Sequence, residues 1–256
     1  LTATGNVGFV GGYYKYWGNN SDRIDFVGSE AHPRDADTSL YHGFIKDGVV
    51  YDSAGVVKDA MLSDSSSTSS AALYINSYTP VFKTGATING LTLEHAWNHD
   101  IVRYADGTIA SLGQARVHGT GSDDPDKRLL YFRFDGTSWK TTYLVKAGPK
   151  LFPDEQDFTG LSALHPDNPH VIFISTTVDP RDDTTLLGKH EIFEGMTCDD
   201  GRTWQWTPLT QNSTVDNLRP VVPRWDSNHT LLLWLRGTYI SAQKYLLEVV
   251  GTTTGL

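Results

Sequence analysis

Cysteine is almost absent from this chain of 256 residues: Cys198 is the only one. One cysteine cannot form a disulfide within the chain, so no disulfide framework holds the fold together. No hydrophobic run reaches the roughly 18 residues that a membrane-spanning helix requires. Long segments rich in Ala, Leu, Glu and Lys are also lacking, whereas the chain contains seven Trp, twelve Tyr and ten Phe. This balance favours strands over helices.

Basic residues are in the minority, with 21 Lys and Arg against 30 Asp and Glu and a formal net charge of −9. Nucleic acid is therefore not expected as a partner, because phosphate binding needs an excess of Lys and Arg. No membrane partner is expected either. An acidic polysaccharide or oligosaccharide stays compatible with this charge, provided that a local basic pocket lies on the acidic body.

The first residues, LTATGNVGFVGG, lack the basic and apolar regions of a signal peptide and are typical of a mature or truncated terminus. Three N-glycosylation sequons begin at Asn19, Asn212 and Asn228. Such sequons also arise by chance in a chain rich in Ser and Thr. Our expectation for localisation is a secreted, extracellular glycoprotein.

Short apolar and aromatic runs, separated by turns of Asp, Gly, Asn and Ser, recur along the whole chain. They predict strands at residues 13–17, 24–27, 40–45, 109–117, 129–134, 171–175, 191–196, 231–235 and 245–250. No helix of convincing length is found. Strands at this spacing predict a sandwich, a barrel or a propeller.

A repeat decides among these three architectures. The turn before Trp139 is echoed at the turn before Trp204, and their glycines, Gly136 and Gly201, lie 65 positions apart. The sequence therefore predicts an all-β fold, a β-propeller of four-stranded antiparallel blades. We count about four units, at residues 1–60, 92–147, 158–209 and 217–250, and a strand at 6–10 would complete the last one. Residues 1–256 then form a single propeller domain or a propeller fragment, with a Ser-rich inserted loop at about 58–72. A small ring of four units and a larger ring that lacks its N-terminal blades here are both compatible with this count.

The second of these turns matches the Asp box, S/T-x-D-x-G-x-T-W, of sialidase-like propellers. We expect the Asp199 carboxylate to accept backbone N–H groups across the turn and Gly201 to adopt a positive φ. Trp204 is expected to pack against a neighbouring blade. This motif predicts architecture and says almost nothing about chemistry.

Residues 219–225, RPVVPRW, are a candidate for the strand that faces a propeller's central channel, because two prolines would damage a central strand. Alternation places Arg219, Val221 and Trp225 on one face. Arg219 is a candidate for binding a substrate carboxylate, which a guanidinium can hold with two hydrogen bonds. A salt link at the surface or between blades is the alternative.

A second group of candidates lies within eleven residues: His32, Arg34, Tyr41 and His42. His32 and His42 can titrate near neutral pH and Arg34 can hold an anion. Tyr41 and His42 point to opposite faces of one strand, so one of them packs inside the blade. A purely structural, hydrogen-bonded histidine is the alternative in each case.

His95 and His99 have the spacing of a metal-binding pair on a helix. On a strand they share a face with Trp97 and lie about 13 Å apart, at about 3.3 Å per residue, so they cannot chelate one ion together. We interpret His95, Trp97 and His99 as a platform for stacking and hydrogen bonding of a sugar. Core packing of Trp97 is the alternative.

No cofactor is expected to be required, and no metal ligand is assigned. A structural zinc or calcium ion is a weaker hypothesis, with His190 and Cys198 joined by His165 or His170 around zinc. A buried free thiol is the simpler interpretation of Cys198. The acidic pairs at Asp123 and Asp124 and at Asp182 and Asp183 are interpreted as solvated turns.

The chain resembles BNR-repeat propellers of the group that contains ulvan lyases and rhamnose–glucuronate lyases. The resemblance runs through most of the chain, in segments 13–17, 23–26, 31–34, 39–42, 157–163, 174–180, 190–195 and 212–220. It implies a seven-bladed ring that cleaves a uronate-containing polysaccharide by β-elimination, of which this chain would be the C-terminal four or so blades. Blades from the rest of the protein are then an expected partner. The chain departs from the family pattern at Gly11 and Gly12, where relatives tend to carry Arg-Pro.

Elimination removes the proton next to a uronate carboxylate, so the carboxylate must first be neutralised and a base must then take the proton. In our hypothesis Arg34 or Arg219 neutralises the charge, and His32, His42 or Tyr16 transfers protons. Two alternatives remain open: a glycoside hydrolase on the same scaffold, such as a rhamnosidase or sialidase, and a carbohydrate-binding propeller without catalysis.

Overall fold

The computed structural model describes residues 12–61, 75–121, 125–153, 158–226 and 228–255. These residues form eighteen strands and one short 3-10 helix, Ile75–Ser77, and contain no α-helix. No helical segment among them has the length and apolar character needed to cross a bilayer. The prediction of an all-β protein is confirmed for the described residues.

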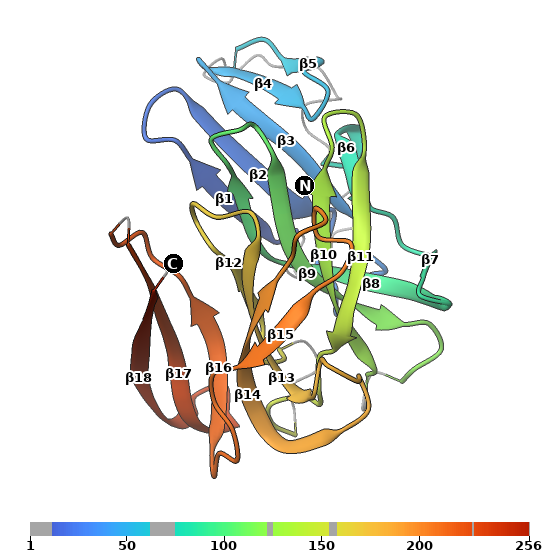
Figure 1. Cartoon of the computed structure of the whole chain (residues 1–256). Coiled ribbons are helices and arrows are strands. Elements are labelled where there is room, and N and C mark those ends of the chain that lie inside the picture. Colours follow the sequence, from blue (N-terminus) through green and yellow to red (C-terminus); the bar gives the residue numbers. More distant parts are fainter. Residues whose placement is uncertain (1–11, 62–74, 122–124, 154–157, 227, 256) are drawn as a thin grey trace.

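The strands form four antiparallel sheets that follow one another along the chain (Figure 1). The first sheet contains β1 (Tyr14–Gly18), β2 (Arg23–Ser29), β3 (Leu40–Lys46), β4 (Val49–Asp52), β5 (Val57–Asp59) and β6 (Thr79–Phe82). The second contains β7 (Ala86–Ile88), β8 (Leu91–Arg103), β9 (Ile109–Val117), β10 (Lys127–Phe134) and β11 (Trp139–Lys146). The third contains β12 (Ser162–Leu164), β13 (Val171–Val178), β14 (Leu186–Met196) and β15 (Gln205–Pro208), and the fourth β16 (Asp216–Val221), β17 (His229–Ser241) and β18 (Lys244–Gly255).

The sheets pack face to face in chain order, and each interface has its own apolar cluster. Val27 and Leu40 of the first sheet pack with Phe132 of the second. Tyr131 of the second sheet packs with Phe193 of the third in another cluster. Phe173, Leu232 and Trp234 join the third sheet to the fourth. Burial of alternate strand residues between successive sheets therefore supplies the core.

One strand of each sheet lies at a common inner edge. β1 contacts β8, β8 contacts β12, and β12 contacts β16. β1, β12 and β16 are terminal strands that pair on one side only, whereas β8 pairs with β7 as well as with β9. Side chains from four separate sheets can therefore reach one space.

Aspartate-centred turns explain how the sequence closes its outer hairpins. The Asp199 carboxylate accepts the backbone N–H groups of Arg202 at 3.0 Å and Thr203 at 2.9 Å, and Gly201 has φ 79°. Trp204 lies edge-on to Tyr131 of the second sheet, 5.1 Å between ring centroids. The three expectations for this turn are confirmed. The turn of the preceding repeat uses Asp135 and Gly136 in the same way.

All nine strands predicted from the sequence are present, with ends that differ by up to six residues. The channel strand is shifted, because β16 ends at Val221 and Trp225 lies beyond it with 64% of its surface exposed. A register shift between Leu218 and Val221 also interrupts the simple alternation expected there. The sheets have six, five, four and three strands, so the described residues do not repeat a uniform four-stranded unit. The expected strand at 6–10, most of the Ser-rich loop and the pair Asp123 and Asp124 lie outside the described residues.

Candidate functional site

A cavity of about 190 Å³ lies where the inner edges of the sheets meet. The first, second and fourth sheets contribute to its wall, together with the segment that precedes β12 of the third. The lining residues are Tyr13, Tyr14 and Lys15 at β1; Trp97, Asn98 and His99 on β8; Gln114 on β9; Phe158 and Leu161 before β12; and Arg219 on β16. Three of the residues singled out from the sequence, Trp97, His99 and Arg219, are brought together here.

Arg219 is held at the cavity by its backbone and by two aromatic rings. Its φ is 54°, at the register shift of β16, and its N–H donates to the Gly160 carbonyl at 2.7 Å. The guanidinium carbon lies 5.0 Å from the ring centroid of Phe158 and 5.9 Å from that of Tyr239. Its Nε is buried without a hydrogen-bond partner, and no carboxylate pairs with this arginine among the described residues.

His99 is buried in the cavity wall, with 7% of its surface exposed. Its Nδ1 lies 2.9 Å from the Ser162 hydroxyl, while its Nε2 has no hydrogen-bond partner in the described part of the chain. Burial, reinforced by the nearby positive charge of Lys15, lowers the pKa of His99 to about 3, although the Gln114 side chain partly opposes this shift. The imidazole is therefore uncharged at neutral pH.

Tyr13 and His32 form a pair in which the direction of the hydrogen bond can be assigned. The backbone N–H of Arg34 donates to His32 Nδ1 at 3.1 Å. Since Nδ1 accepts, a neutral His32 carries its proton on Nε2, which lies 3.0 Å from the Tyr13 hydroxyl oxygen. His32 therefore donates to a phenol that lines the cavity, and it acts on the cavity through Tyr13.

The segment 158–162 organises much of the cavity. Phe158 packs near Trp97, 5.6 Å between ring centroids, as well as below Arg219. The Thr159 hydroxyl donates to the Gln114 side-chain oxygen at 2.6 Å, and Ser162 contacts His99. Gly160 is required by space, since a Cβ there would lie 2.3 Å from the Ser175 carbonyl oxygen.

Sequence reasoning missed Tyr13, Lys15 and Gln114 as cavity residues. Tyr13 and Lys15 belong to the motif that carried the family resemblance, so that motif was the available signal. Gln114 had no such signal, because it lies in the middle of an ordinary strand. Only the pairing of β9 with β8, which sets Gln114 opposite Trp97, brings it to the cavity.

Four other predicted residues lie elsewhere. His42 is fully buried between Asp25 and Ser53, at 3.2 and 2.8 Å, and burial lowers its pKa. Tyr41 is 3% exposed in an apolar cluster, with its hydroxyl near Lys83. Tyr16 is 64% exposed and stacks on Tyr14, and the Arg34 side chain is exposed. None of the four lines the cavity.

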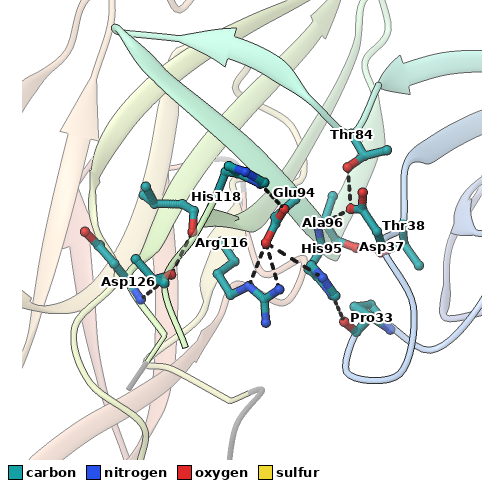
Figure 2. A network of polar contacts seen from close by, with 12 residues as sticks. Pro33, Asp37, Thr38, Thr84, Glu94, His95, Ala96, Arg116, His118 and Asp126 are labelled. Carbon is teal, nitrogen blue, oxygen red and sulfur yellow. Dashed lines mark hydrogen bonds and ion pairs between the residues drawn. The ribbon is translucent and has the colours of Figure 1, made fainter. Parts of the chain in front are cut away.

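The expected common face of His95, Trp97 and His99 is wrong. Register shifts in β8 between Glu94 and Trp97, and again between Asn98 and Asp100, break the two-residue alternation. His95 has φ 51° and its Nδ1 contacts the Pro33 carbonyl. Figure 2 shows His95 in a polar network of its own, and His95 is not among the residues that line the cavity.

That network contains Asp37, Glu94 and His95, whose donor atoms lie within 4.8 Å of one another, close enough for a metal ion. These three side chains already form hydrogen bonds with other groups of the protein (Figure 2). Glu94 accepts hydrogen bonds from Arg116 at 2.7 Å and His118 at 2.7 Å, and these hold the pKa of Glu94 below its usual value although burial raises it. Asp37 accepts the backbone N–H of His95 at 3.0 Å. A guanidinium on the same carboxylate disfavours a cation, so we interpret the network as a structural link between the first two sheets.

The structural zinc hypothesis gains no geometric support. His190 contacts Asp216 at 3.0 Å, and both ring nitrogens of His165 have partners: Thr230, and the backbone N–H groups of residues 167 and 168. Cys198 is exposed rather than buried, which corrects the simpler interpretation of its thiol. Among the described residues, these side chains do not form a group within metal-binding distance.

No protein-family model and no curated protein matches the sequence. Solved structures do match. An ulvan lyase of polysaccharide lyase family PL25 aligns with a TM-score of 0.61 at 11% identity, over 95% of this chain and 51% of the lyase. The same lyase family bound to -[GlcA(1-4)Rha3S]- aligns with a TM-score of 0.59 at 11% identity, over 98% of this chain and 53% of the other.

A GH93 α-L-arabinofuranosidase of Fusarium graminearum, in complex with arabinobiose, aligns with a TM-score of 0.52 at 13% identity, over 94% of this chain and 62% of that enzyme. These proteins are carbohydrate-active enzymes of the propeller type. At such identities the likeness shows the fold: several sheets of an all-β, propeller-type architecture. The chain spans about half the length of the ulvan lyase structures it matches.

Proposed function

We propose that this chain belongs to a carbohydrate-active enzyme, a polysaccharide lyase that binds a uronic-acid-containing glycan in the cavity and cleaves it by β-elimination. The observation that carries the proposal is Arg219, which two aromatic rings hold at the cavity with no carboxylate partner among the described residues. In a chain with a net charge of −9, a half-buried guanidinium without an acidic partner among the described residues is suited to an anion from outside.

Arg219 binds and neutralises the uronate carboxylate in this proposal. Neutralisation lets the carbon next to the carboxylate lose its proton, because the negative charge that develops on the carboxylate is compensated. Lys15, at the same cavity, adds a second positive charge. The geometry favours Arg219 over Arg34, whose side chain is exposed and does not line the cavity.

Tyr13 transfers the proton. As a phenolate it takes the proton from the carbon next to the carboxylate, the C–H electron pair forms the new double bond, and the bond to the leaving oxygen breaks. The resulting phenol then protonates that oxygen. The His32 Nε2–H and the two cations stabilise the phenolate, so His32 is a positioning residue rather than the group that touches the substrate.

Elimination is favoured over hydrolysis by what lines the cavity. Glycoside hydrolases commonly use two carboxyl groups that flank the scissile bond. No Asp or Glu is among the described residues that line this cavity. A binding propeller without catalysis remains the competing function, since the chain matches about half of the ulvan lyase. We propose further blades of the same protein as its partner and an extracellular location.

Incubation of the protein with uronate-rich glycans tests the function. Elimination creates an unsaturated uronate, which we expect to appear as new ultraviolet absorbance together with shorter chains. New reducing ends without this absorbance would instead show hydrolysis. Binding without either product would show a carbohydrate-binding module.

A further inference from the structure

In the wall of the cavity, one ring nitrogen of His99 has a hydrogen-bond partner, and the other has none among the described residues. His99 Nδ1 lies 2.9 Å from the Ser162 hydroxyl. His99 Nε2 is buried and has no partner among the described residues. A buried polar atom without a partner is costly unless a ligand or water satisfies it.

We propose that His99, positioned by Ser162, hydrogen-bonds a free hydroxyl group of the bound sugar and so discriminates against glycans in which that hydroxyl is substituted. The inference deepens the proposed function and rests on it for the presence of a sugar in the cavity. It assigns recognition of the carboxylate to Arg219 and recognition of the hydroxyl to His99, two residues that line one cavity.

A hydroxyl suits this position better than an anion does. Burial keeps the imidazole uncharged at neutral pH, so His99 offers no positive charge to a sulfate or a carboxylate. A sugar hydroxyl can donate and accept, and it can therefore pair with Nε2 in either neutral tautomer. A sulfate ester in the same place would bury a charge against a neutral ring, and a methyl ether would lose the donor.

Ser162 is well placed to fix the ring because the short strand β12 is held at two points. Ser162 pairs with Ile174 in the third sheet. Two residues later, the N–H of Leu164 donates to the Asp100 carboxylate at 2.9 Å, which ties β12 to β8 beside His99. The hydroxyl therefore approaches Nδ1 from a rigid strand, and Ser162→Ala removes the bond without removing the strand.

The first test does not depend on activity. Nitrogen chemical shifts of the His99 ring should show one dominant neutral tautomer between pH 5 and 8 in the wild-type protein. Ser162→Ala should give a mixture of tautomers or of ring positions, and Ser162→Thr, which keeps a hydroxyl, should restore one. A wild-type ring that titrates near neutral pH, or a Ser162→Ala spectrum identical to that of the wild type, would overturn the role of Ser162.

The second test uses pairs of uronate oligosaccharides that differ at single hydroxyls, free in one member and methylated or sulfated in the other. We expect the wild type to prefer one free hydroxyl by about tenfold in kcat/KM, the value of one neutral hydrogen bond. His99→Phe should reduce this ratio to about one, and Ser162→Ala should reduce it partly, mainly through KM. His170→Phe, at an exposed histidine away from the cavity, is the matched control.

Dissociation constants for the same pairs separate the two proposals. If the wild type binds the oligosaccharides with this preference but produces no unsaturated product, the lyase proposal fails and the hydroxyl assignment stands. If the wild type cleaves all members of the pairs equally well, or if His99→Phe keeps the preference, the hydroxyl assignment fails and the lyase proposal stands.

Discussion

The strand β8 carries two histidines, four residues apart, that lie in opposite kinds of surroundings. Around His95 the charged groups are mutually satisfied: Glu94 pairs with Arg116 and His118, and the His95 ring contacts a backbone carbonyl (Figure 2). Around His99, two buried polar atoms, Arg219 Nε and His99 Nε2, have no hydrogen-bond partner in the described part of the chain. Complete pairing stabilises the fold, whereas groups left without partners at a cavity are available to a ligand.

Removal of the Arg219 charge should have the largest effect on activity. Arg219→Ala is expected to lower the rate of elimination by about a hundredfold or more, because the carboxylate is no longer neutralised in the transition state. Arg116→Ala, in the paired network, should retain most of the activity. The measurement is the initial rate at which ultraviolet absorbance increases. Comparable losses of activity in the two variants would contradict the distinction between the cavity and the paired network around His95.

Removal of a paired charge should instead lower stability. Glu94→Ala leaves Arg116 and His118 without their acceptor, and we expect a loss of about 2 kcal/mol in the free energy of unfolding, with activity nearly unchanged. The exposed pair of Arg236 and Glu248 provides the control, since Glu248→Ala should cost about 0.5 kcal/mol or less. Denaturant unfolding measures both. A loss of activity without loss of stability in Glu94→Ala would contradict the structural role.

The pH dependence of stability tests the burial of His99. His99 has a lower pKa in the folded protein, about 3, than in the unfolded chain, about 6.5, so the unfolded state binds the proton first as the pH falls. This costs the wild type roughly 2 kcal/mol at pH 5. The stability of the wild type relative to His99→Gln should therefore decline from pH 7 to pH 5, as measured by denaturant unfolding at each pH.

Protonation of Asp100 changes the stability of the fold in the opposite direction, so its contribution needs a separate control. Burial raises the pKa of this carboxyl group to about 6, so its folded state binds the proton first and gains stability as the pH falls through 6. The comparison of wild type with Asp100→Asn isolates this contribution. If neither difference curve changes with pH, the burial of charge next to the cavity has been assigned wrongly.

Lys15 should have the smallest effect. It is exposed, and an exposed charge contributes little and is screened by salt. Lys15→Met is expected to raise KM about threefold to fivefold at low ionic strength, and the difference should shrink as salt is added. A KM effect that is insensitive to salt would point to a direct contact with the substrate instead.

The sequence was a good guide to the strands and a partial guide to the cavity. Turn residues such as Asp199 and Gly201 act within a few residues of themselves, so their geometry could be predicted locally. Arg219, Trp97 and His99 were singled out and do line the cavity, while their roles remain predictions. His42 was indistinguishable from His32 in the sequence, because burial between Asp25 and Ser53 depends on distant strands.

Alternation of side chains is a rule for regular strands, and it failed where β8 and β16 shift register. Those shifts separate His95 from Trp97 and set Arg219 in a left-handed conformation beside Gly160. No local sequence pattern predicts such a register shift, because the shift depends on which residue of the neighbouring strand supplies the next hydrogen bond.

Composition and short-range hydrogen bonds are properties of the chain, so the strand-rich class, the acidic charge and the aspartate turns follow from the order of amino acids alone. Which charges are paired, and which are left at the cavity, follows from the fold. Pairing depends on side chains from separate sheets, and their distances are set by packing across the molecule rather than by spacing along it.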